Sequence, residues 1–573
     1  MVKPKNRLDL VRLSFFLCFG ILFLRLATLQ IKDAPELKRR ARAEHFKTIL
    51  VPAPRGTIYD RNGKLLAISV KYYALYAEPK YLKEPPASVA ERLAPILDES
   101  PVHLTAVLSS DKGFVWLKRR LNYDDYVTVR DLKIEGIGFQ ETYCRFYPEG
   151  EFTSHIVGVV DIDGKGLEGI EKEYNHLLVG KDGKTNILRD GIGRSIPSYN
   201  KGDAPRPGQD VYLTIDLAVQ RVLEEEIERV FEAYSPRGVV GIVLDANNGE
   251  ILALANRPTY DPNQPNLYPV DFRRNRAITD LFEPGSVFKI ITAAAGLEEN
   301  LIKPEGTIFC EAGKFFVRGH VLHDAHPYGT ISFREVIVKS SNIGTVKVGL
   351  RLGEKRMYKY AEAFGFGKET GIDLPGEISG ILRPLAKWSG YSITAIPIGQ
   401  EVGATALQCS VALAAVVNGG RYYQPYFLLY PQTQKPPARQ VISEKTTETL
   451  SEILSEVTTE EGTARWADIP GYFVGGKTGT GQKVVGGYYS HHKFFASFAG
   501  FIKTTHRNLI IFVMADEPKG AYYGGVVAGP AFNRIGQRTL LVLDIPPDRE
   551  IVTELQQNGF VDTGQNGDEK NER

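Results

Sequence analysis

One apolar stretch near the N-terminus restricts where this chain of 573 residues can reside. The stretch runs from Leu13 to Ile31 and is apolar apart from four residues, Ser14, Arg25, Thr28 and Gln30. Its length is enough for a helix to cross a bilayer. A buried helix would need a polar face for water, and Leu26–Leu29 is a poor signal-peptide cleavage site. We therefore expect an uncleaved transmembrane anchor whose Arg25 extends toward the interface.

The basic residues around this stretch do not orient it. Lys and Arg residues lie both before Leu13 and after Ile31, so the positive-inside rule favours neither side for the N-terminus. No second apolar stretch of spanning length follows, and we therefore expect a tail at residues 1–12, an anchor at 13–31 and the rest of the chain on one side of the membrane.

Composition excludes several classes of function. Lys plus Arg number 70 and Asp plus Glu number 68, so the net charge of +2 leaves no overall electrostatic signature for a nucleic-acid partner. Four cysteines lie far apart in the sequence, with no C-x-x-C pair. This spacing argues against a disulfide-rich scaffold and against a cysteine-built zinc site.

Turn-rich and α/β-like patterns divide the remainder of the chain. Residues 32–205 alternate short β-like runs with turns and form no catalytic constellation, and the Pro- and Gly-bearing stretch 195–209 indicates a domain boundary. A second domain is expected over 206–550, with a Pro-rich loop at 431–437. The polar tail at 551–573 is expected to be disordered.

The order of strands in the second domain predicts its architecture. Two early strands, Gly238–Leu244 and Ile251–Ala255, flank a hairpin-type turn at Asn247–Gly249. Three late strands are expected at Tyr472–Thr480, Phe494–Ile502 and Leu509–Ala515, after a largely helical insertion. We predict a multidomain α/β protein in which helices cover one five-stranded, mostly antiparallel sheet.

The first chemical motif is Glu283-Pro284-Gly285-Ser286-Val287-Phe288-Lys289. Pro284 suits the first turn of a helix, and an alanine-rich run follows. Residues i and i+3 share a helix face, so the amine of Lys289 can reach the hydroxyl of Ser286 and act as its base. Burial or a second cation is needed to lower the pKa of Lys289. Ser-x-x-Lys alone is weak, because it recurs by chance in many helices.

Two further motifs supply the missing groups. Lys339-Ser340-Ser341-Asn342 could equally be a helix cap, and Gly475–Thr480 (Gly-Gly-Lys-Thr-Gly-Thr) could be a turn. On a strand, Thr478 and Thr480 share a face and can hold a substrate carboxylate, while Gly479 leaves room for a substrate backbone. Lys477 would be the second cation.

The three motifs, in this order, resemble the signature set of penicillin-binding proteins and serine β-lactamases. The resemblance to class B penicillin-binding proteins extends nearly end to end. Its supporting segments are residues 55–63, 145–148, 155–158, 166–171, 275–280, Trp388, 399–400, 522–525 and 530–532. It implies a β-rich pedestal of the dimerisation type at 32–205 and a β-lactamase-like transpeptidase domain at 206–550.

The resemblance also implies a role for each motif residue. Ser286 would attack the carbonyl between the two D-alanines of a peptidoglycan stem peptide, and Lys289 would accept its proton. Ser340 and Lys477 would relay a proton to the departing D-alanine. Asn342 would orient the acyl-enzyme, which an amine of a neighbouring stem peptide would resolve into a cross-link.

Cofactors, partners and location follow from the same resemblance. The backbone N–H groups of Ser286 and Thr480 would form the oxyanion hole, and no metal or cofactor is needed. β-Lactams should acylate the same serine. The chain should be a single-pass protein of the cytoplasmic membrane, with a cytoplasmic N-terminus and a periplasmic or extracellular catalytic domain. It should work with other division proteins and a SEDS-type lipid II polymerase.

Residues 67–69 and 77–80 and the context of Ser340 most resemble the division-specific, septal transpeptidases. The elongation-specific class B enzyme is the near alternative. A D,D-carboxypeptidase or β-lactamase would pass the acyl group to water, although a secreted β-lactamase needs no anchor or pedestal. A β-lactam sensor would need a signalling domain on the other side of the membrane, and the roughly twelve residues before Leu13 are too few to form one. An inactive division scaffold would not need the intact Ser286, Lys289 and Lys477.

Three further groups of residues allow other interpretations. His320, His323, His326 and Asp324 could bind zinc, but Gly319, Pro327 and Gly329 indicate a loop there. His491-His492 is expected to be an exposed turn near the cleft entrance. Cys310 and Cys409 could pair outside the cytoplasm, a question that sequence leaves open.

Overall fold

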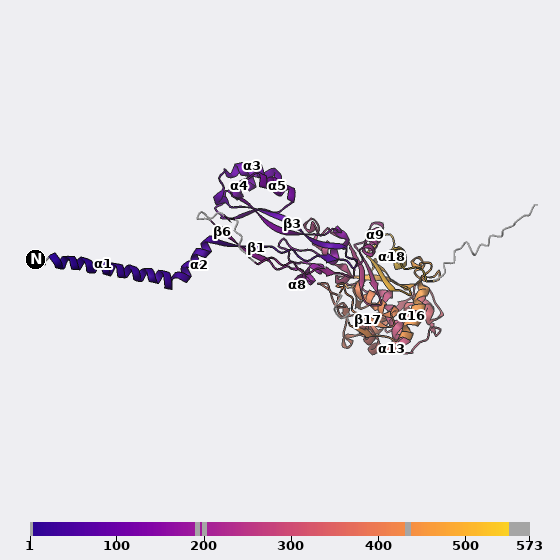
Figure 1. Cartoon of the computed structure of the whole chain (residues 1–573). Helices are drawn as coiled ribbons and strands as arrows, with labels where there is room; N and C mark the ends of the chain where they lie inside the picture. The colour runs from indigo at the N-terminus through magenta and orange to yellow at the C-terminus, as the bar shows by residue number, and fades with distance from the viewer. Residues whose placement is uncertain (1–3, 190–194, 197–202, 430–436, 549–573) are drawn as a thin grey trace, which may run out of the picture. The chain divides into compact units, whose positions relative to one another are not determined.

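The structure, a computed structural model, describes residues 4–189, 195–196, 203–429 and 437–548 (Figure 1). They form two compact units. Unit 1 comprises residues 1–56, 69–144 and 179–209, and unit 2 comprises 57–68, 145–178 and 210–573. Two segments that the sequence groups with the pedestal, 57–68 and 145–178, thus pack within unit 2. Most of the Pro-rich loop and the tail after Ile551 lie outside the described residues.

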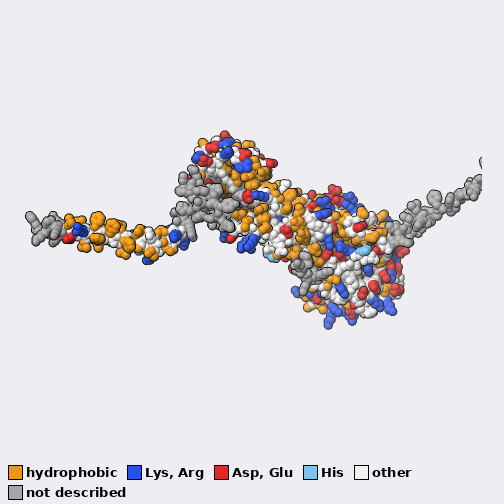
Figure 2. All heavy atoms as spheres, viewed as in Figure 1, with side chains coloured by type: hydrophobic (Ala, Val, Ile, Leu, Met, Phe, Trp, Pro, Cys, Tyr) orange, Lys and Arg blue, Asp and Glu red, His pale blue; other side chains and the backbone are white. Residues whose placement is uncertain are grey.

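Unit 1 begins with a long apolar helix, along which Figure 2 shows mainly hydrophobic side chains. Helix α1 (Pro4–Ala27) continues into a wider π-type turn at Thr28–Lys32. Leu8–Lys32 is long and apolar enough to cross a membrane, with a mean hydropathy of 2.0 and none of its most apolar window buried. The span starts earlier than the expected Leu13 and includes Asp9 and Arg12, which pair at 3.7 Å.

The rest of unit 1 contains two small β-structures. Strands β1 (Phe46–Val51), β6 (Gly183–Arg189) and β7 (Ser195–Ile196) form one antiparallel sheet. Strand β3 (Leu65–Ala77) begins in unit 2 and continues into unit 1. In unit 1 it pairs with β4 (Val115–Leu121) and with β5 (Ile137–Phe146). Helices α3 (Pro86–Leu97), α4 (Pro101–Leu108) and α5 (Tyr123–Asp131) pack there around Leu75, Leu93 and Leu104. Helix α2 spans Ala34–His45.

Unit 2 is built on a five-stranded antiparallel sheet, which confirms the predicted fold class. Its spatial order is β10-β9-β21-β20-β19. The strands are β9 (Gly238–Asp245), β10 (Ile251–Arg257), β19 (Phe473–Val485), β20 (Tyr488–Lys503) and β21 (Asn508–Asp516). The first two strands therefore meet the late strands through β9–β21, and β19 lies at an edge.

Strands β19 and β20 are longer than predicted and meet at Gly486-Gly487, both with positive φ. The residues that extend the two strands, 481–485 and 488–493, do not alternate regularly between polar and apolar side chains, so the sequence does not indicate this extension. His491-His492 is consequently not a turn, because both residues lie within β20, although both are exposed. The interpretation of these histidines as a turn was wrong.

Helices cover both faces of the sheet because alternate strand residues are apolar on each side. On one face Val239 and Val243 join the core of α9 (Leu217–Tyr234) and α18 (Gly529–Val542), which Figure 1 shows side by side. On the other face Val240 and Ile242 join the core that contains α11 (Lys289–Glu298) and α15 (Ala406–Val417).

Unit 2 contains further helices and short strands outside this sheet. The helices are α6 (Ser154–Val157), α7 (Gly169–Glu173), α8 (Asn175–Leu178), α10 (Arg276–Thr279), α12 (Phe333–Val338), α13 (Asn342–Ala363), α14 (Ser392–Ala395), α16 (Glu444–Ser455) and α17 (Gly524–Val527). The strands are β2 (Ile58–Tyr59), β8 (Val211–Tyr212), β11 (Thr307–Phe309), β12 (Lys314–Val317), β13 (His320–His323), β14 (Thr330–Ser332), β15 (Ile381–Leu382), β16 (Val402–Gly403), β17 (Arg421–Tyr423) and β18 (Ala438–Gln440).

Candidate active site

Ser286 lies in a 3₁₀ turn, Gly285–Phe288, which runs directly into α11. In a 3₁₀ turn the side chains of residues i and i+3 lie above one another, so Ser286 and Lys289 share a face. Ser286 is half-buried, whereas Lys289 is fully buried. The turn packs closely on Gly399, where a Cβ atom would lie 2.2 Å from the carbonyl oxygen of Gly285.

The ammonium group of Lys289 has three acceptors, all in the second motif. Its Nζ donates to the backbone oxygen of Ser340 at 2.6 Å, to Ser340 Oγ at 3.1 Å and to Asn342 Oδ1 at 2.7 Å. A charged lysine has three N–H donors, so this set satisfies all of them. Among the hydrogen bonds of the described residues, none joins Lys289 Nζ to Ser286 Oγ.

The turn that presents these acceptors joins α12 to α13. Ser340 has a φ of 58°, a left-handed conformation that is uncommon for a residue other than glycine. The next residue, Ser341, is the N-cap of α13 and accepts a hydrogen bond from the N–H of Gly344 at 2.9 Å. The helix-cap interpretation thus applies to Ser341, while Ser340 and Asn342 face Lys289.

Lys477 lies on β19 and is completely buried. Within the described part of the chain its Nζ has no hydrogen-bond partner. Burial lowers the pKa of Lys477 from 10.5 to about 7. Burial also lowers the pKa of Lys289 far below its usual value, and the charge of Lys477 lowers it further. The two amines from distant parts of the sequence therefore interact electrostatically.

The residues after Lys477 line the edge of the sheet next to the 3₁₀ turn. A Cβ atom at Gly479 would lie 3.0 Å from Val287 Cγ2 and 3.3 Å from the carbonyl oxygen of Pro284. Thr480 Oγ1 accepts a hydrogen bond from the N–H of Gly524 at 3.3 Å, and Thr478 Oγ1 lies 2.9 Å from Thr463 Oγ1. The structure thus brings Thr478, Gly479 and Thr480 to the vicinity of Ser286.

Comparison with known proteins gives a consistent result. The model of the penicillin-binding protein transpeptidase domain matches residues 239–537, and that of the penicillin-binding protein dimerisation domain matches residues 50–213. Stage V sporulation protein D of Bacillus subtilis is 35% identical, over 94% of this chain and 86% of that protein. Peptidoglycan D,D-transpeptidase FtsI of Escherichia coli is 30% identical, over 95% of this chain and 93% of that protein.

The chain belongs to the class B penicillin-binding proteins. A solved structure agrees: penicillin-binding protein 3 of Mycobacterium tuberculosis, complexed with aztreonam, has a TM-score of 0.68 and 27% identity. The match covers 88% of this chain and 99% of that one. The sequence-based identification is therefore confirmed, and the chain carries the family's transpeptidase domain.

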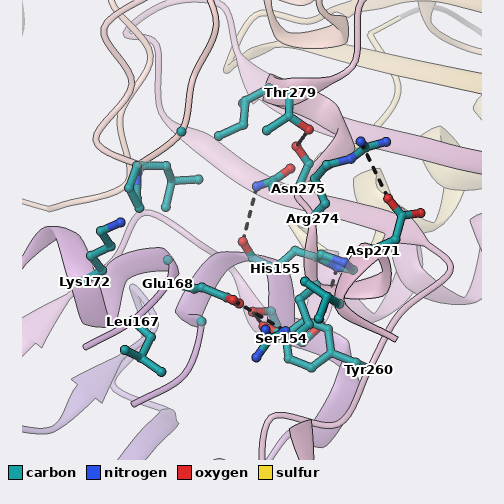
Figure 3. Close-up of a pocket in the computed structure, with 18 residues that line it drawn as sticks. Ser154, His155, Leu167, Glu168, Lys172, Tyr260, Asp271, Arg274, Asn275 and Thr279 are labelled. Atoms are coloured by element: carbon teal, nitrogen blue, oxygen red, sulfur yellow. Dashed lines mark hydrogen bonds and ion pairs between the residues drawn. The ribbon is translucent and has the colours of Figure 1, made fainter. Parts of the chain in front are cut away.

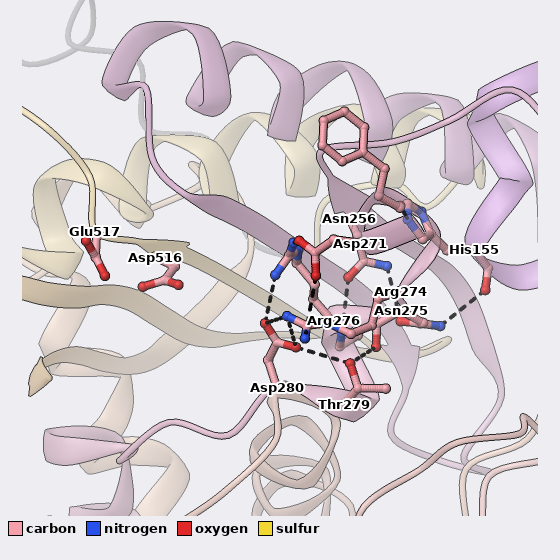
Figure 4. A network of polar contacts seen from close by, with 12 residues as sticks. His155, Asn256, Asp271, Arg274, Asn275, Arg276, Thr279, Asp280, Asp516 and Glu517 are labelled. Atoms are coloured by element: carbon pink, nitrogen blue, oxygen red, sulfur yellow. Dashed lines mark hydrogen bonds and ion pairs between the residues drawn. The ribbon is translucent and has the colours of Figure 1, made fainter. Parts of the chain in front are cut away.

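The segment that leads to Ser286 of this penicillin-binding protein is held by a polar network (Figure 4). Arg276, at the start of α10, is buried and pairs with Asp271 and with Asp280, the latter at 3.1 Å. Asn256 accepts a hydrogen bond from the N–H of Ala277 at 3.0 Å. Since Asp280 lies six residues before Ser286, the network fixes the approach to the active-site turn.

A pocket of about 570 Å³ is lined by residues of the segments 154–172, 270–279 and 374–376, together with Tyr260 (Figure 3). Its lining includes His155, Glu168, Tyr260 and Asn275 but none of the motif residues described above. Burial lowers the pKa of His155 to about 4, so this side chain is neutral at pH 7. This pocket is therefore separate from the motif residues.

Sequence reasoning assigned Asp324 only to a possible zinc cluster. The structure instead places its carboxylate on the start of α13, where it accepts hydrogen bonds from Ser341 and Ile343. Among the described residues no group of three or more His, Cys, Asp or Glu side chains is arranged to hold a metal ion. Cys310 and Cys409 are both free thiols, and Cys310 lies 3.4 Å from Ser341 Oγ.

The buried amine of Lys477 predicts a gain in stability when it is removed. Lys477→Met keeps an unbranched side chain of similar volume but deletes the unpartnered amine. We therefore expect the free energy of unfolding at neutral pH to rise by about 1 to 2 kcal/mol. Thermal unfolding of the full chain in detergent would measure this. A lower melting temperature would contradict it.

The gain should also depend on pH in a defined direction. The folded-state pKa of Lys477 lies below that of the unfolded chain, so between these values the unfolded state binds more protons. The stability of the native protein should therefore increase from about pH 7 toward pH 10, and the advantage of Lys477→Met should shrink over the same range.

Proposed function

We propose that the protein is a membrane-anchored serine D,D-transpeptidase that cross-links peptidoglycan stem peptides, with Ser286 as its nucleophile. The observation that supports this most is that Ser340 and Asn342 converge on Lys289, three residues after Ser286, and that the charge of Lys477 acts on the same amine. The names and titles of the relatives support the same substrate class, because they describe a peptidoglycan D,D-transpeptidase and an aztreonam complex.

In the proposed acylation step, neutral Lys289 takes the proton of Ser286 Oγ as that oxygen bonds to the carbonyl carbon between two D-alanines. A neutral amine has two N–H donors and one lone pair, so one of the three acceptors around Nζ is released and the lone pair turns to Ser286. The backbone N–H groups of Ser286 and Thr480 stabilise the oxyanion, and Thr478 and Thr480 hold the terminal carboxylate.

The tetrahedral intermediate then collapses by breaking the C–N bond to the terminal D-alanine. Ser340 and Lys477 relay a proton to that nitrogen, and a pKa of about 7 lets Lys477 supply and regain a proton near neutral pH. Asn342 orients the acyl-enzyme. The amine of a second stem peptide attacks the ester and forms the cross-link as the bond to Ser286 Oγ breaks. The amine's proton passes to Lys477, and Lys289 returns its proton to Ser286 Oγ, which restores the hydroxyl and both lysines.

We further propose where the protein acts and which partners it has. The helix at Leu8–Lys32 holds the chain in the membrane with the N-terminus in the cytoplasm and the catalytic domain outside, where the stem peptides are. The protein acts at the septum with a SEDS-type lipid II polymerase and other division proteins.

Fluorescent penicillin tests these assignments in two ways. We expect labelled protein to gather at midcell, and labelling along the side wall would move the assignment to elongation. The lifetime of the purified acyl-enzyme separates transfer from hydrolysis: release within seconds would indicate a hydrolase, whereas a long-lived adduct with cross-linking of added donor and acceptor peptides supports transpeptidation.

A further inference from the structure

A single carboxylate binds the start of helix α13 from outside the helix. Asp324 follows β13, and its Oδ1 accepts hydrogen bonds from the backbone N–H groups of Asn342 and Ile343, the latter at 3.0 Å. Its Oδ2 accepts from Ser341 Oγ at 2.6 Å. The preceding carbonyl, that of His323, accepts from Asn342 Nδ2 at 2.9 Å. The segment 323–324 thus binds Ser341 and Asn342 of the second motif and Ile343, which follows them.

These contacts hold a strained piece of backbone. Ser340 adopts a left-handed conformation that the chain keeps only where neighbouring contacts enforce it. The bonds from Asp324 begin at the next residue and continue into the first turn of α13, where the positive end of the helix dipole favours a negative charge. Ser340 is therefore held so that both its backbone oxygen and its hydroxyl face Lys289.

Asp324 also faces Lys289 electrostatically. Burial and the charge of Lys477 on β19 lower the pKa of Lys289, and the charge of Asp324 raises it. The other groups against Lys289 Nζ are the neutral acceptors of Ser340 and Asn342. Two opposite charges, from β19 and from the loop after β13, therefore act on this buried amine.

We infer that Asp324 is a positioning residue of the transpeptidase site. Its carboxylate holds the Ser340–Asn342 turn against Lys289, and its negative charge counteracts the effect of the positive charge of Lys477 on that amine. The inference rests on the proposed roles of Ser286 and Lys289 as nucleophile and base. It concerns how the chain prepares that base, and Asp324 itself touches no reacting atom.

Asp324→Asn separates the charge from the geometry. The amide oxygen can still accept from the N–H groups of Asn342 and Ile343, and the amide nitrogen can donate to Ser341 Oγ. The hydroxyl of Ser341 can then donate to Cys310 Sγ, which already lies 3.4 Å away. This substitution should keep the turn in place while it removes the charge.

The measurement is the rate constant of acylation of the full-length protein by fluorescent penicillin as a function of pH. For Asp324→Asn we expect the rising limb of the profile to move to lower pH, because Lys289 loses the negative charge that raises its pKa. The plateau rate should stay within about threefold of the native value. For Asp324→Ala the plateau should fall about tenfold or more, because the turn loses its hydrogen bonds.

Glu311→Gln provides a matched control, because Glu311 pairs with Lys347 at 2.6 Å and is not among the groups that act on Lys289. Its profile should coincide with that of the native protein. An unchanged rising limb in Asp324→Asn would overturn the inference, as would a native plateau in Asp324→Ala. If the native protein were not acylated at Ser286, the proposed function would fail first, so the two failures are distinguishable.

Discussion

Ser286→Ala is expected to abolish covalent labelling by penicillin while the protein keeps its fold and its membrane attachment. The hydroxyl oxygen is the only heavy atom removed, and the 3₁₀ turn depends on the backbone contact between Gly285 and Gly399 rather than on this side chain. Among the hydrogen bonds of the described residues none uses Ser286 Oγ, so the substitution breaks no interaction of the resting structure. We expect the melting temperature to change little.

Gel fluorescence and mass spectrometry of tryptic peptides would measure the labelling and its position. Ser443→Ala is a suitable control, since Ser443 caps α16 through a hydrogen bond to the N–H of Thr446. Loss of that cap should cost about 1 kcal/mol of stability without reducing labelling. Labelling that persists in Ser286→Ala would refute the assignment of the nucleophile.

The helix start that carries Ser286 and the sheet were predictable from sequence because their signals are local. Pro284 and the alanines after Lys289 indicate a helix start, and the i, i+3 spacing survives although the turn is 3₁₀ rather than α-helical. The apolar strands β9, β10 and β21 likewise have patterns that a short window contains. The extensions of β19 (481–485) and β20 (488–493) mix Val and Tyr with polar residues without regular alternation, so no comparable pattern marks them.

Long-range contacts could not be predicted in the same way. Nothing in the sequence around Asp324 distinguishes a zinc ligand from a carboxylate that binds the start of a helix, because its role depends on how the chain folds back to bring Ser341, 17 positions later, against it. The left-handed conformation of Ser340 could not be predicted, because the residue at this position is not the glycine that usually marks such a conformation. The lack of a hydrogen-bond partner for Lys477 is similarly a property of the packed interior, where no acceptor among the described residues reaches its amine.

Lys289→Met should reduce acylation almost as strongly as the loss of the serine itself. Methionine matches the volume of the lysine but has no lone pair that can take a proton, and positioned general bases contribute about 100-fold to 10,000-fold in rate. We therefore expect the rate constant of acylation to fall by at least about 100-fold. The residual rate should also lose the rising limb with pH that titration of Lys289 produces.

Lys339→Met is the matched control for this experiment, because Lys339 neighbours Ser340 in sequence but pairs with Glu335 at 2.8 Å instead of facing the site. Its labelling rate and pH profile should remain native. If Lys289→Met also retained the native rate, another group would have to be the base, and buried Lys477, with its pKa of about 7, would be the first to examine. If only the rising limb persisted, the pH dependence would belong to Lys477 and not to Lys289. The rate and the profile together thus assign the proton transfer to one of the two amines.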